Sequence, residues 1–239
     1  MTLDPTAATA ASDEESGSPA ILVDTADIPG GGQLHLVRHG ADFEILFGDE
    51  QLMGSWESRS EEALATLVCQ RLGKRAGRIL VGGLGMGFTL AAAAAALPAS
   101  AKIVVVELVP KVVTWAAGPL AHLFGDSLAD ARISVEIRDV HDVIVEQPSS
   151  FDGILLDVDN GPDGLIKLAN ERLYCNWGLR AAYAALRPGG ILAVWSAYQD
   201  EAFADRLRCA GFEVEEHTVH MDGSEEDLSH TIWLAAKAG

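Results

Sequence analysis

The feature that most constrains the fold is a regular alternation between short apolar runs and segments with helical periodicity, which begins near residue 60 and continues to about residue 236. Strands that recur between helices pair in parallel, because each helical crossover returns the chain to the same edge of the sheet. The apolar runs are RILVG, KIVVVE, ISVEIRD, FDGILLD and GGILAVWSA. The sequence therefore predicts an α/β fold with a doubly wound, mostly parallel, Rossmann-like sheet that has helices on both faces.

Two segments depart from this alternation. The runs EVEEHTV and TIWLAA have no helical segment between them, so we expect them to form an antiparallel pair at one edge of the sheet. Residues 60–72 carry apolar side chains at helical spacing, and Ser60, which stands ahead of two acidic residues, is the predicted N-cap of this helix. A helix is thus expected to lead into the first strand of the sheet.

The segment before this helix divides into two parts. Residues 1–19 are small, polar and acidic, which is typical of a disordered tail, because such a segment buries too little to offset its ordering entropy. Residues 20–59 contain short alternating runs, QLHLVRHG and FEILFG, between glycine-rich and acidic turns. They predict a small N-terminal β-region that is separate from the main domain at residues 60–239.

A formal net charge of −18 at pH 7 limits the partners of the protein. Phosphate backbones bind proteins mainly through Lys and Arg, so we expect no nucleic-acid partner. The acidity would suit a cationic substrate such as a polyamine, although solubility alone is the simpler explanation. No apolar stretch reaches the roughly 18 residues of a membrane span and no signal-peptide pattern is present, so we expect no membrane association and a cytoplasmic location. The three cysteines lack metal-ligand spacing, and no metal is expected.

The turn after the first strand of the predicted sheet is rich in glycine. Gly82, Gly83, Gly85 and Gly87 are the predicted cofactor-binding residues here, because glycines permit a tight turn and let a ligand lie against the backbone at a helix N-terminus. A dinucleotide-binding loop needs a third small residue where this sequence has Phe88. A nucleoside with a sulfonium amino-acid tail has no pyrophosphate and does not need that close packing, so it fits the loop better than NAD.

Polar residues also follow the next two strands. Glu107, which lies 22 residues beyond Gly85, is placed to accept hydrogen bonds from both hydroxyls of a ribose, with Leu108 beside it. Asp139 can accept a hydrogen bond from an adenine amino group while Val140 packs on the ring. Each acid also has a structural interpretation: Glu107 could cap the next turn, and Asp139 could be the N-cap of the following helix.

The fourth strand is followed by two acids and an amide, Asp157, Asp159 and Asn160. Carboxylates beside a sulfonium can orient an amine nucleophile and accept its proton, so Asp157 and Asp159 are the predicted catalytic residues. Turn formation is the alternative for these residue types, most of all for Asp159 and Asn160.

Together these segments resemble a known family. The runs are VGGLGMGFTL, VVVEL, IRDVHD, FDGILLDVDNGPDGL and LYCNWGLRAAYAALRPGGILAVWSA. In this order they are similar to the spermidine synthase-like branch of the class I S-adenosylmethionine-dependent methyltransferase superfamily, over roughly residues 43 to 236. The resemblance implies a seven-stranded sheet with one antiparallel strand, an N-terminal β-appendage, a homodimer, and an S-adenosylmethionine-binding catalytic domain at residues 60–239. It also places five residues on donor-binding or catalytic positions: Gly83, Gly85, Glu107, Asp139 and Asp157.

The sequence departs from the family at three places. The aminopropyltransferases carry an acid inside the glycine-rich loop, G-G-G-D-G-G, where this chain has Gly85. Their tyrosine-histidine-glutamate segment is replaced by Ser60-Glu61-Glu62, and their D-S-x-D-P becomes DVDNGP. The loop acid of a spermidine synthase would repel a donor carboxylate, and we expect Gly85 to leave that space free.

These departures favour a methyltransferase that uses S-adenosylmethionine and acts on a small acceptor, with amines among the candidates. The alternative is a polyamine aminopropyltransferase, a spermidine synthase, that uses decarboxylated S-adenosylmethionine. A third hypothesis is a non-catalytic nucleoside-binding protein that has kept the fold.

Overall fold

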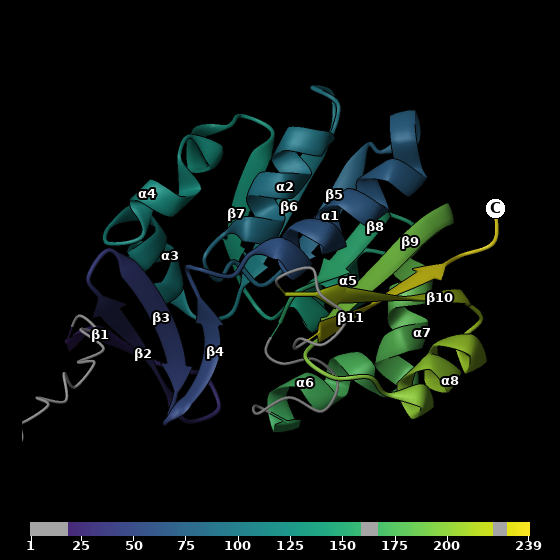
Figure 1. Ribbon diagram of the computed structural model, residues 1–239. Helices are drawn as coiled ribbons and strands as arrows, with labels where there is room; N and C mark the ends of the chain where they lie inside the picture. Colours follow the sequence, from purple (N-terminus) through teal and green to yellow (C-terminus); the bar gives the residue numbers. More distant parts are fainter. Residues whose placement is uncertain (1–18, 159–166, 222–228) are drawn as a thin grey trace, which may run out of the picture.

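The structure is a computed structural model that describes residues 19–158, 167–221 and 229–239. It contains a seven-stranded sheet in the order β10-β11-β9-β8-β5-β6-β7 and a four-stranded sheet in the order β1-β2-β3-β4 (Figure 1). The strands of the larger sheet are β5 (Arg78–Gly82), β6 (Lys102–Glu107), β7 (Ile133–Ile137), β8 (Phe151–Leu156), β9 (Leu186–Ser196), β10 (Glu213–His220) and β11 (Ser229–Ala236). The predicted tail lies almost entirely outside the described residues.

The predicted doubly wound α/β sheet is confirmed. Strands β9, β8, β5, β6 and β7 pair in parallel, whereas β11 runs antiparallel to both β9 and β10. The expected antiparallel pair at one edge is therefore present. The chain winds from β5 out to β7 and then crosses to β8, so the strand order reverses between β5 and β8, which is the place where ligands bind in open α/β sheets.

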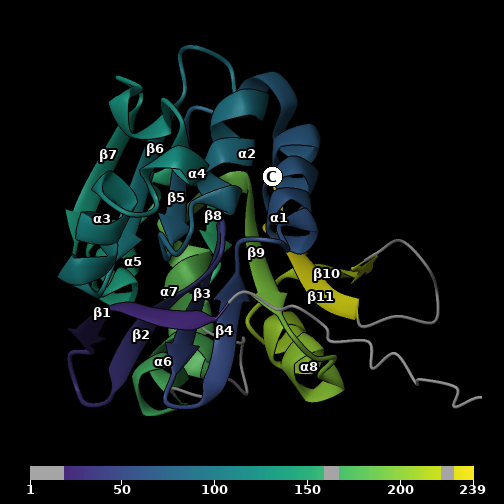
Figure 2. The ribbon, with the colours of Figure 1, turned by 60° about the vertical axis from the view of Figure 1, so that its left-hand side comes forward.

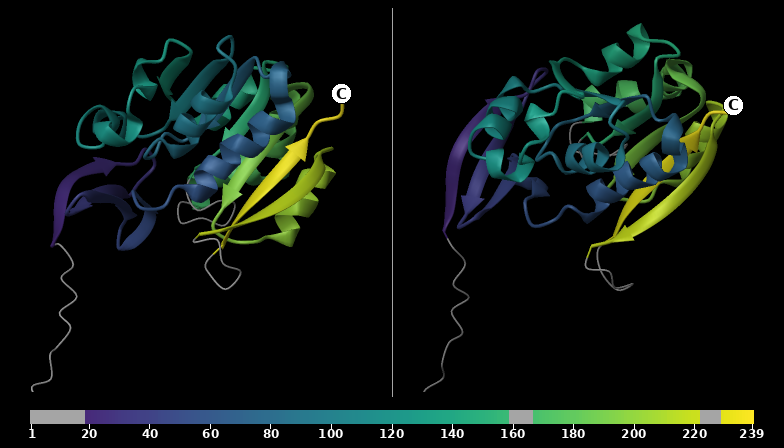
Figure 3. Two further views of the ribbon diagram at one scale, coloured as in Figure 1. Left: turned by 45° about the horizontal axis from the view of Figure 1, so that its top comes forward. Right: turned by 90° about the horizontal axis from the view of Figure 1, so that it is seen from above.

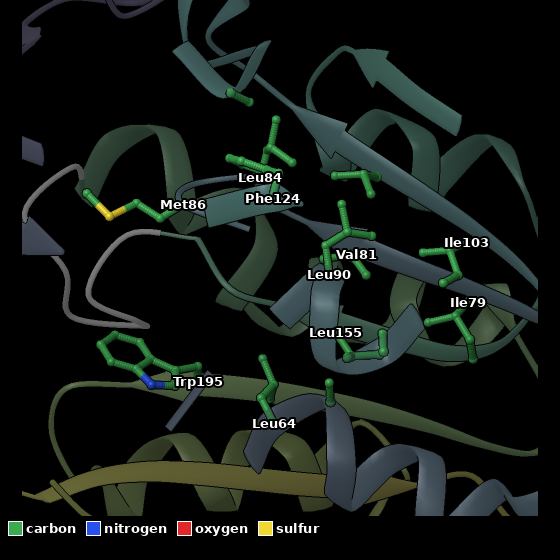
Figure 4. Packing of buried hydrophobic residues seen from close by; sticks show 14 of the residues in the cluster. Leu64, Ile79, Val81, Leu84, Met86, Leu90, Ile103, Phe124, Leu155 and Trp195 are labelled. Atoms are coloured by element: carbon green, nitrogen blue, oxygen red, sulfur yellow. The ribbon is translucent and has the colours of Figure 1, made fainter. Parts of the chain in front are cut away.

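Helices cover both faces of the larger sheet, because successive side chains of a strand point to opposite faces. In β5, Ile79 and Val81 pack in one cluster with Leu64 and Leu90, whereas Leu80 packs in a second cluster on the other face. Figure 4 shows the first cluster, which reaches from Leu64 to Phe124 and Trp195. The helices are α1 (Arg59–Leu72), α2 (Phe88–Ala96), α3 (Pro110–Ala117), α4 (Ala121–Phe124), α5 (Val140–Glu146), α6 (Lys167–Tyr174), α7 (Asn176–Ala185) and α8 (Glu201–Cys209). In Figure 1, α1 and α2 lie in front of the sheet and α5 and α7 behind it.

The predicted N-terminal β-region is the smaller sheet. Its antiparallel strands are β1 (Ala20–Asp27), β2 (Gln33–His39), β3 (Asp42–Phe47) and β4 (Glu50–Gly54). Figures 2 and 3 show this sheet at one end of the larger one, away from the C-terminus. Asp24 of β1 links it to α3: its carboxylate accepts a hydrogen bond from Trp115 Nε1 (2.9 Å) and lies 3.1 Å from Lys111 Nζ.

The prediction that Ser60 caps the first helix is wrong. Helix α1 begins at Arg59, so Ser58 precedes it and Ser60 lies within its first turn. The hydroxyl of Ser58 donates to Glu62 (2.8 Å), whereas Ser60 is buried and turns toward the larger sheet. Within the described ranges, no helix has the length and hydrophobicity needed to cross a lipid bilayer.

Candidate active site

A cavity of about 880 Å³, part of it open to solvent, lies at the carboxyl ends of β5, β6, β7 and β8. The four-stranded sheet closes it from the other side. Its walls include Ile28, Leu34, Ile45, Leu52 and Met53 of the N-terminal region, and Gly83, Gly85, Glu107, Leu108, Asp139, Val140 and Asp157 after the strands. Seven of the predicted site residues therefore meet here, and we call this space the donor cavity.

The four glycines of the loop have different surroundings. Gly83 lies at φ +90°, and a Cβ there would stand 2.1 Å from the main-chain oxygen of Asp157, so only glycine fits. Gly87 also has positive φ, and a Cβ there would collide with Phe124, while one at Gly82 would press on Val140. Gly82 and Gly87 are therefore explained by packing beneath the cavity, and only Gly83 and Gly85 line it.

The expectation that Gly85 leaves free space above the loop is wrong. A Cβ on Gly85 would lie 2.7 Å from Cε and 3.0 Å from Sδ of Met53, which reaches over from β4. A thioether from the other sheet thus lies where the sequence resemblance implies an acid in the aminopropyltransferases. The end of a methionine side chain is flexible and can shift, and Gly85 still lines the donor cavity.

Glu107 lies where the sequence predicts it, buried at the end of β6. Its Oε2 accepts a hydrogen bond from Leu84 N and its Oε1 from Val109 N, each at 2.8 Å. Burial raises the pKa of Glu107 and these main-chain donors oppose that effect. The carboxylate therefore holds the glycine loop, and it also lines the donor cavity; recognition of a ribose by Glu107 stays a prediction.

Asp139 is the N-cap of α5, as its structural interpretation predicts. Its Oδ1 accepts a hydrogen bond from His141 N (2.8 Å), and its Oδ2 lies 3.3 Å from Arg172 Nη1. Both Asp139 and Val140 also line the donor cavity. The cap is thus established, and recognition of adenine by the second oxygen stays a prediction.

Asp157 follows β8 directly, and its main-chain N–H donates to Gly82 O of the neighbouring strand (3.0 Å). The hydroxyl of Thr89 donates to Asp157 Oδ2 (2.5 Å). Burial raises the pKa of Asp157 to about 6, because the low-dielectric site disfavours the charged carboxylate. Asp159 and Asn160 lie outside the described residues.

A second cavity of about 560 Å³ adjoins the first and shares Leu52 and Met53 with it. Its other walls are Gln51, Gly54, Glu57, Glu61, Trp195, Ala197, Tyr198 and His230. These residues come from β4, the start of α1, the end of β9, and β11. We call this space the acceptor cavity; the sequence interpretation did not identify it.

Glu61 is the acid of the acceptor cavity with the most altered ionisation. Burial raises its pKa to about 7, and the nearby charge of Asp157 adds to this rise. The hydroxyl of Ser60 donates to Glu61 Oε2 (2.6 Å), and His230 Nδ1 lies 2.9 Å from the same hydroxyl. The sequence signal that could have identified Glu61 is the replacement of the family's tyrosine-histidine-glutamate segment by Ser60-Glu61-Glu62.

Comparison with known proteins identifies the fold. A spermidine synthase in complex with the transition state analogue AdoDATO is similar, with a TM-score of 0.74 and 16% identity over 91% of this chain and 74% of that one. The chain has the spermidine synthase fold. The synthase from Thermotoga maritima has a TM-score of 0.72 and 14% identity, covering 91% of this chain and 72% of that one. A probable spermidine synthase from Corynebacterium glutamicum ATCC 13032 has a TM-score of 0.63 and 14% identity, covering 91% and 80%.

No family model and no curated protein matches the sequence. The resemblance that the motifs indicate is therefore carried by the fold, including the seven-stranded sheet, its single antiparallel strand β11 and the N-terminal β-appendage. The donor cavity lies where the strand order reverses, between β5 and β8. The expected homodimer stays a prediction.

Proposed function

We propose that the protein transfers an aminopropyl group from decarboxylated S-adenosylmethionine to a small amine acceptor. The observation that carries this proposal is the acidic acceptor cavity beside the donor cavity. Glu57 and Glu61 line the acceptor cavity, and Asp157 lines the donor cavity next to it. Among the described residues that line the acceptor cavity, none is Lys or Arg. Such a surface attracts ammonium groups and repels carboxylates.

The same charges argue for the decarboxylated donor. The methionine tail of S-adenosylmethionine carries a carboxylate, which would approach Asp157 and Glu61, and a like-charge contact of this kind costs several kcal/mol. The guanidinium at the donor cavity is Arg138, which lies next to Asp139 in the chain and donates to Glu146 (2.7 Å). Arg138 lies at the end of the cavity where adenine is predicted to bind. Its positive charge therefore does not offset the negative charges of Asp157 and Glu61, which would lie near the tail of the donor.

In the proposed reaction the acceptor nitrogen attacks the carbon bound to the sulfonium. The N–C bond forms, the C–S bond breaks, and the sulfur leaves as a neutral thioether. An acceptor that arrives as an ammonium loses one proton overall, and a carboxylate at the junction of the cavities takes it. Most of the rate would come from aligning nitrogen, carbon and sulfur, because this displacement needs little covalent help.

Methyl transfer from S-adenosylmethionine is the second candidate. One observation favours it: the aminopropyltransferases of the family have an acid in the loop that would repel the carboxylate of S-adenosylmethionine, and this chain has Gly85 at that position. Met53 fills the corresponding space and weakens this argument. Asp157 and Glu61 are the acids left to hold the tail ammonium that both donors carry.

The decisive experiment is incubation of the protein with each donor and a panel of linear diamines and monoamines, followed by mass spectrometry of the products. We expect aminopropylated amine and 5′-methylthioadenosine from the decarboxylated donor. Methylated amine from S-adenosylmethionine would replace the proposal by the second candidate. Binding of either donor without any product would identify a non-catalytic nucleoside-binding protein.

A further inference from the structure

The two acids with raised pKa lie on different sides of the reaction. Asp157 lines the donor cavity, and its Oδ2 is occupied by the hydroxyl of Thr89 (2.5 Å). Glu61 lines the acceptor cavity. The same Thr89 hydroxyl lies 3.2 Å from the main-chain oxygen of Glu61, so the two residues are close neighbours. A sulfonium would meet Asp157 first, whereas an incoming amine would meet Glu61 first.

Glu61 is held by a hydrogen-bonded chain that crosses from α1 to β11. Ser60, which is buried, has one hydroxyl proton and donates it to Glu61 Oε2 (2.6 Å). The hydroxyl oxygen then accepts from His230 Nδ1 (2.9 Å), which assigns the imidazole proton to Nδ1. The ring of Trp195 packs edge-on against His230 with centroids 4.6 Å apart, which fixes the orientation of the imidazole.

Building on the proposed transfer to an amine, we propose that Glu61 accepts the proton of the acceptor ammonium, and that Ser60 and His230 are positioning residues that orient its carboxylate. Asp157 then stays ionised beside the sulfonium. In the family that the chain resembles, a tyrosine and a histidine stand at the positions of Ser60 and Glu61, so this arrangement belongs to the present chain.

The proposed step conserves both protons and electrons. The ammonium gives one N–H proton to the Glu61 carboxylate, and the freed lone pair forms the N–C bond while the C–S electrons return to sulfur. Glu61 then releases the proton to water at the mouth of the acceptor cavity, where Tyr198 is 67% exposed. A carboxyl group whose pKa lies near neutral pH can both take and release a proton, and burial with Asp157 nearby holds the pKa of Glu61 at about 7.

The titratable groups around Glu61 come from four parts of the chain. They are Asp157 after β8, Glu57 before α1, His230 on β11 and Tyr198 after β9. Burial lowers the pKa of His230, so this imidazole is neutral near pH 7 and does not pair with Glu61 as a cation. The described lining of the cavity contains no Lys or Arg, so a bound diammonium would place a cation beside Glu61 and shift it to its ionised form.

The test uses 1,4-diaminobutane, whose binding is measured by calorimetry between pH 6 and 8 in two buffers that differ in ionisation enthalpy. We expect the wild type to release protons on binding, most strongly near pH 7, because the bound dication ionises Glu61. Glu61→Gln should lose this release. The control is Glu62→Gln, since Glu62 is exposed, neighbours Glu61 and lines neither cavity, and it should release protons as the wild type does. Unchanged release by Glu61→Gln, or no binding to the wild type, would overturn the inference.

Activity separates this inference from the proposed function. With the decarboxylated donor, Glu61→Gln should lower kcat by about 10²- to 10⁴-fold, the usual effect of losing a positioned base. Full activity of this variant would overturn the role of Glu61 and leave the transfer reaction standing. Proton release on diamine binding without turnover by the wild type would support the assignment of Glu61 and overturn the proposed function.

The role of the positioning residues has its own readout. The Ser60 hydroxyl stabilises the charged carboxylate, so Ser60→Ala should raise the pKa of Glu61 and move the pH midpoint of proton release upward by about half a unit to one unit. Ser60→Thr, which keeps the hydroxyl, should restore the midpoint. A purely structural serine would change the thermal stability and leave the midpoint where it is, and that result would contradict the positioning role.

Discussion

The two adjoining cavities differ in the kind of contact that holds their functional side chains. On the donor side the main chain does the positioning: Leu84 N and Val109 N hold Glu107, and Gly83 fits against the main-chain oxygen of Asp157. On the acceptor side the contacts are between side chains: His230 donates to the hydroxyl of Ser60, which donates to Glu61. A change on the donor side should therefore disturb both folding and binding, whereas one on the acceptor side should act mainly on binding and chemistry.

The largest effect is expected for Gly83→Ala. The new Cβ would lie 2.1 Å from Asp157 O, so the loop and the end of β8 must move apart, and the residue would also be strained at φ +90°. Donor affinity should fall by about 100-fold or more, together with a lower melting temperature. Calorimetry and thermal unfolding measure the two effects.

Gly30→Ala is the matched control for this substitution. Gly30 has a similar φ of +101°, but a Cβ there would meet nothing within 4 Å. It should show the cost of backbone strain alone and leave donor binding unchanged. Equal losses in the two variants would mean that the loop contributes a turn and nothing more, which would break the distinction between the two cavities.

Glu107→Ala should give the next largest effect. Donor affinity should fall by about 1.5–3 kcal/mol, the usual range for hydrogen bonds to a charged group. The free energy of unfolding should fall as well, because Leu84 N and Val109 N lose their acceptor inside the protein. Glu107→Gln, which keeps one acceptor oxygen, should lie between. Weaker binding without any loss of stability would show that Glu107 is not part of the loop's support.

The buried acids Glu61 and Asp157 should make the stability of the protein depend on pH. On folding, the pKa values of Glu61 and Asp157 rise from their ordinary values of 4.5 and 3.8 to about 7 and about 6. The folded protein therefore binds more protons than the unfolded chain between these limits, and its stability falls as pH rises from about 4 to about 7.

Glu61→Gln should flatten this fall and melt higher than the wild type at pH 8, by about 2–5 °C. Glu62→Gln should follow the wild type, because Glu62 is exposed. Circular dichroism melts at several pH values decide the point. Parallel curves for Glu61→Gln and the wild type would show that Glu61 titrates normally.

The sequence predicts the two cavities to different degrees for a physical reason. Gly83, Glu107, Asp139 and Asp157 each follow a parallel strand, and the ends of parallel strands meet at one edge of the sheet, so their proximity follows from strand order alone. Ser60 and His230 are 170 residues apart and meet only because β11 inserts beside β9. The apolar periodicity of the two segments does not indicate that β11 inserts beside β9.

Contacts between the two sheets could not be predicted from the sequence either. The contact of Met53 with Gly85 depends on how the four-stranded sheet is placed against the larger one. One contact between them joins Asp24 to Trp115 and Lys111 of α3. Each partner alone resembles an ordinary surface or core residue. The interpretation of Gly85 as open space therefore failed, although the loop itself was predicted correctly.

The smallest effect is expected at Asp139, where two substitutions separate the helix cap from adenine recognition. Asp139→Ala removes the acceptor for His141 N and should cost about 1 kcal/mol of stability as well as some donor affinity. In Asp139→Asn the amide oxygen can keep the cap, which places the NH₂ group where Oδ2 now lies. That group cannot accept a hydrogen bond from an adenine amino group.

Asp139→Asn should therefore lose little stability, because it weakens only the exposed contact with Arg172. It should bind an adenosyl donor about 5- to 10-fold more weakly, as expected for one hydrogen bond of about 1 kcal/mol. The same variant should bind an inosine analogue of the donor no worse than the wild type does, because that base has a carbonyl in place of the amino group. Equal weakening toward both ligands would mean that Asp139 shapes the cavity only through the start of α5. Stability and base recognition would then be inseparable at this residue, as they are expected to be elsewhere on the donor side.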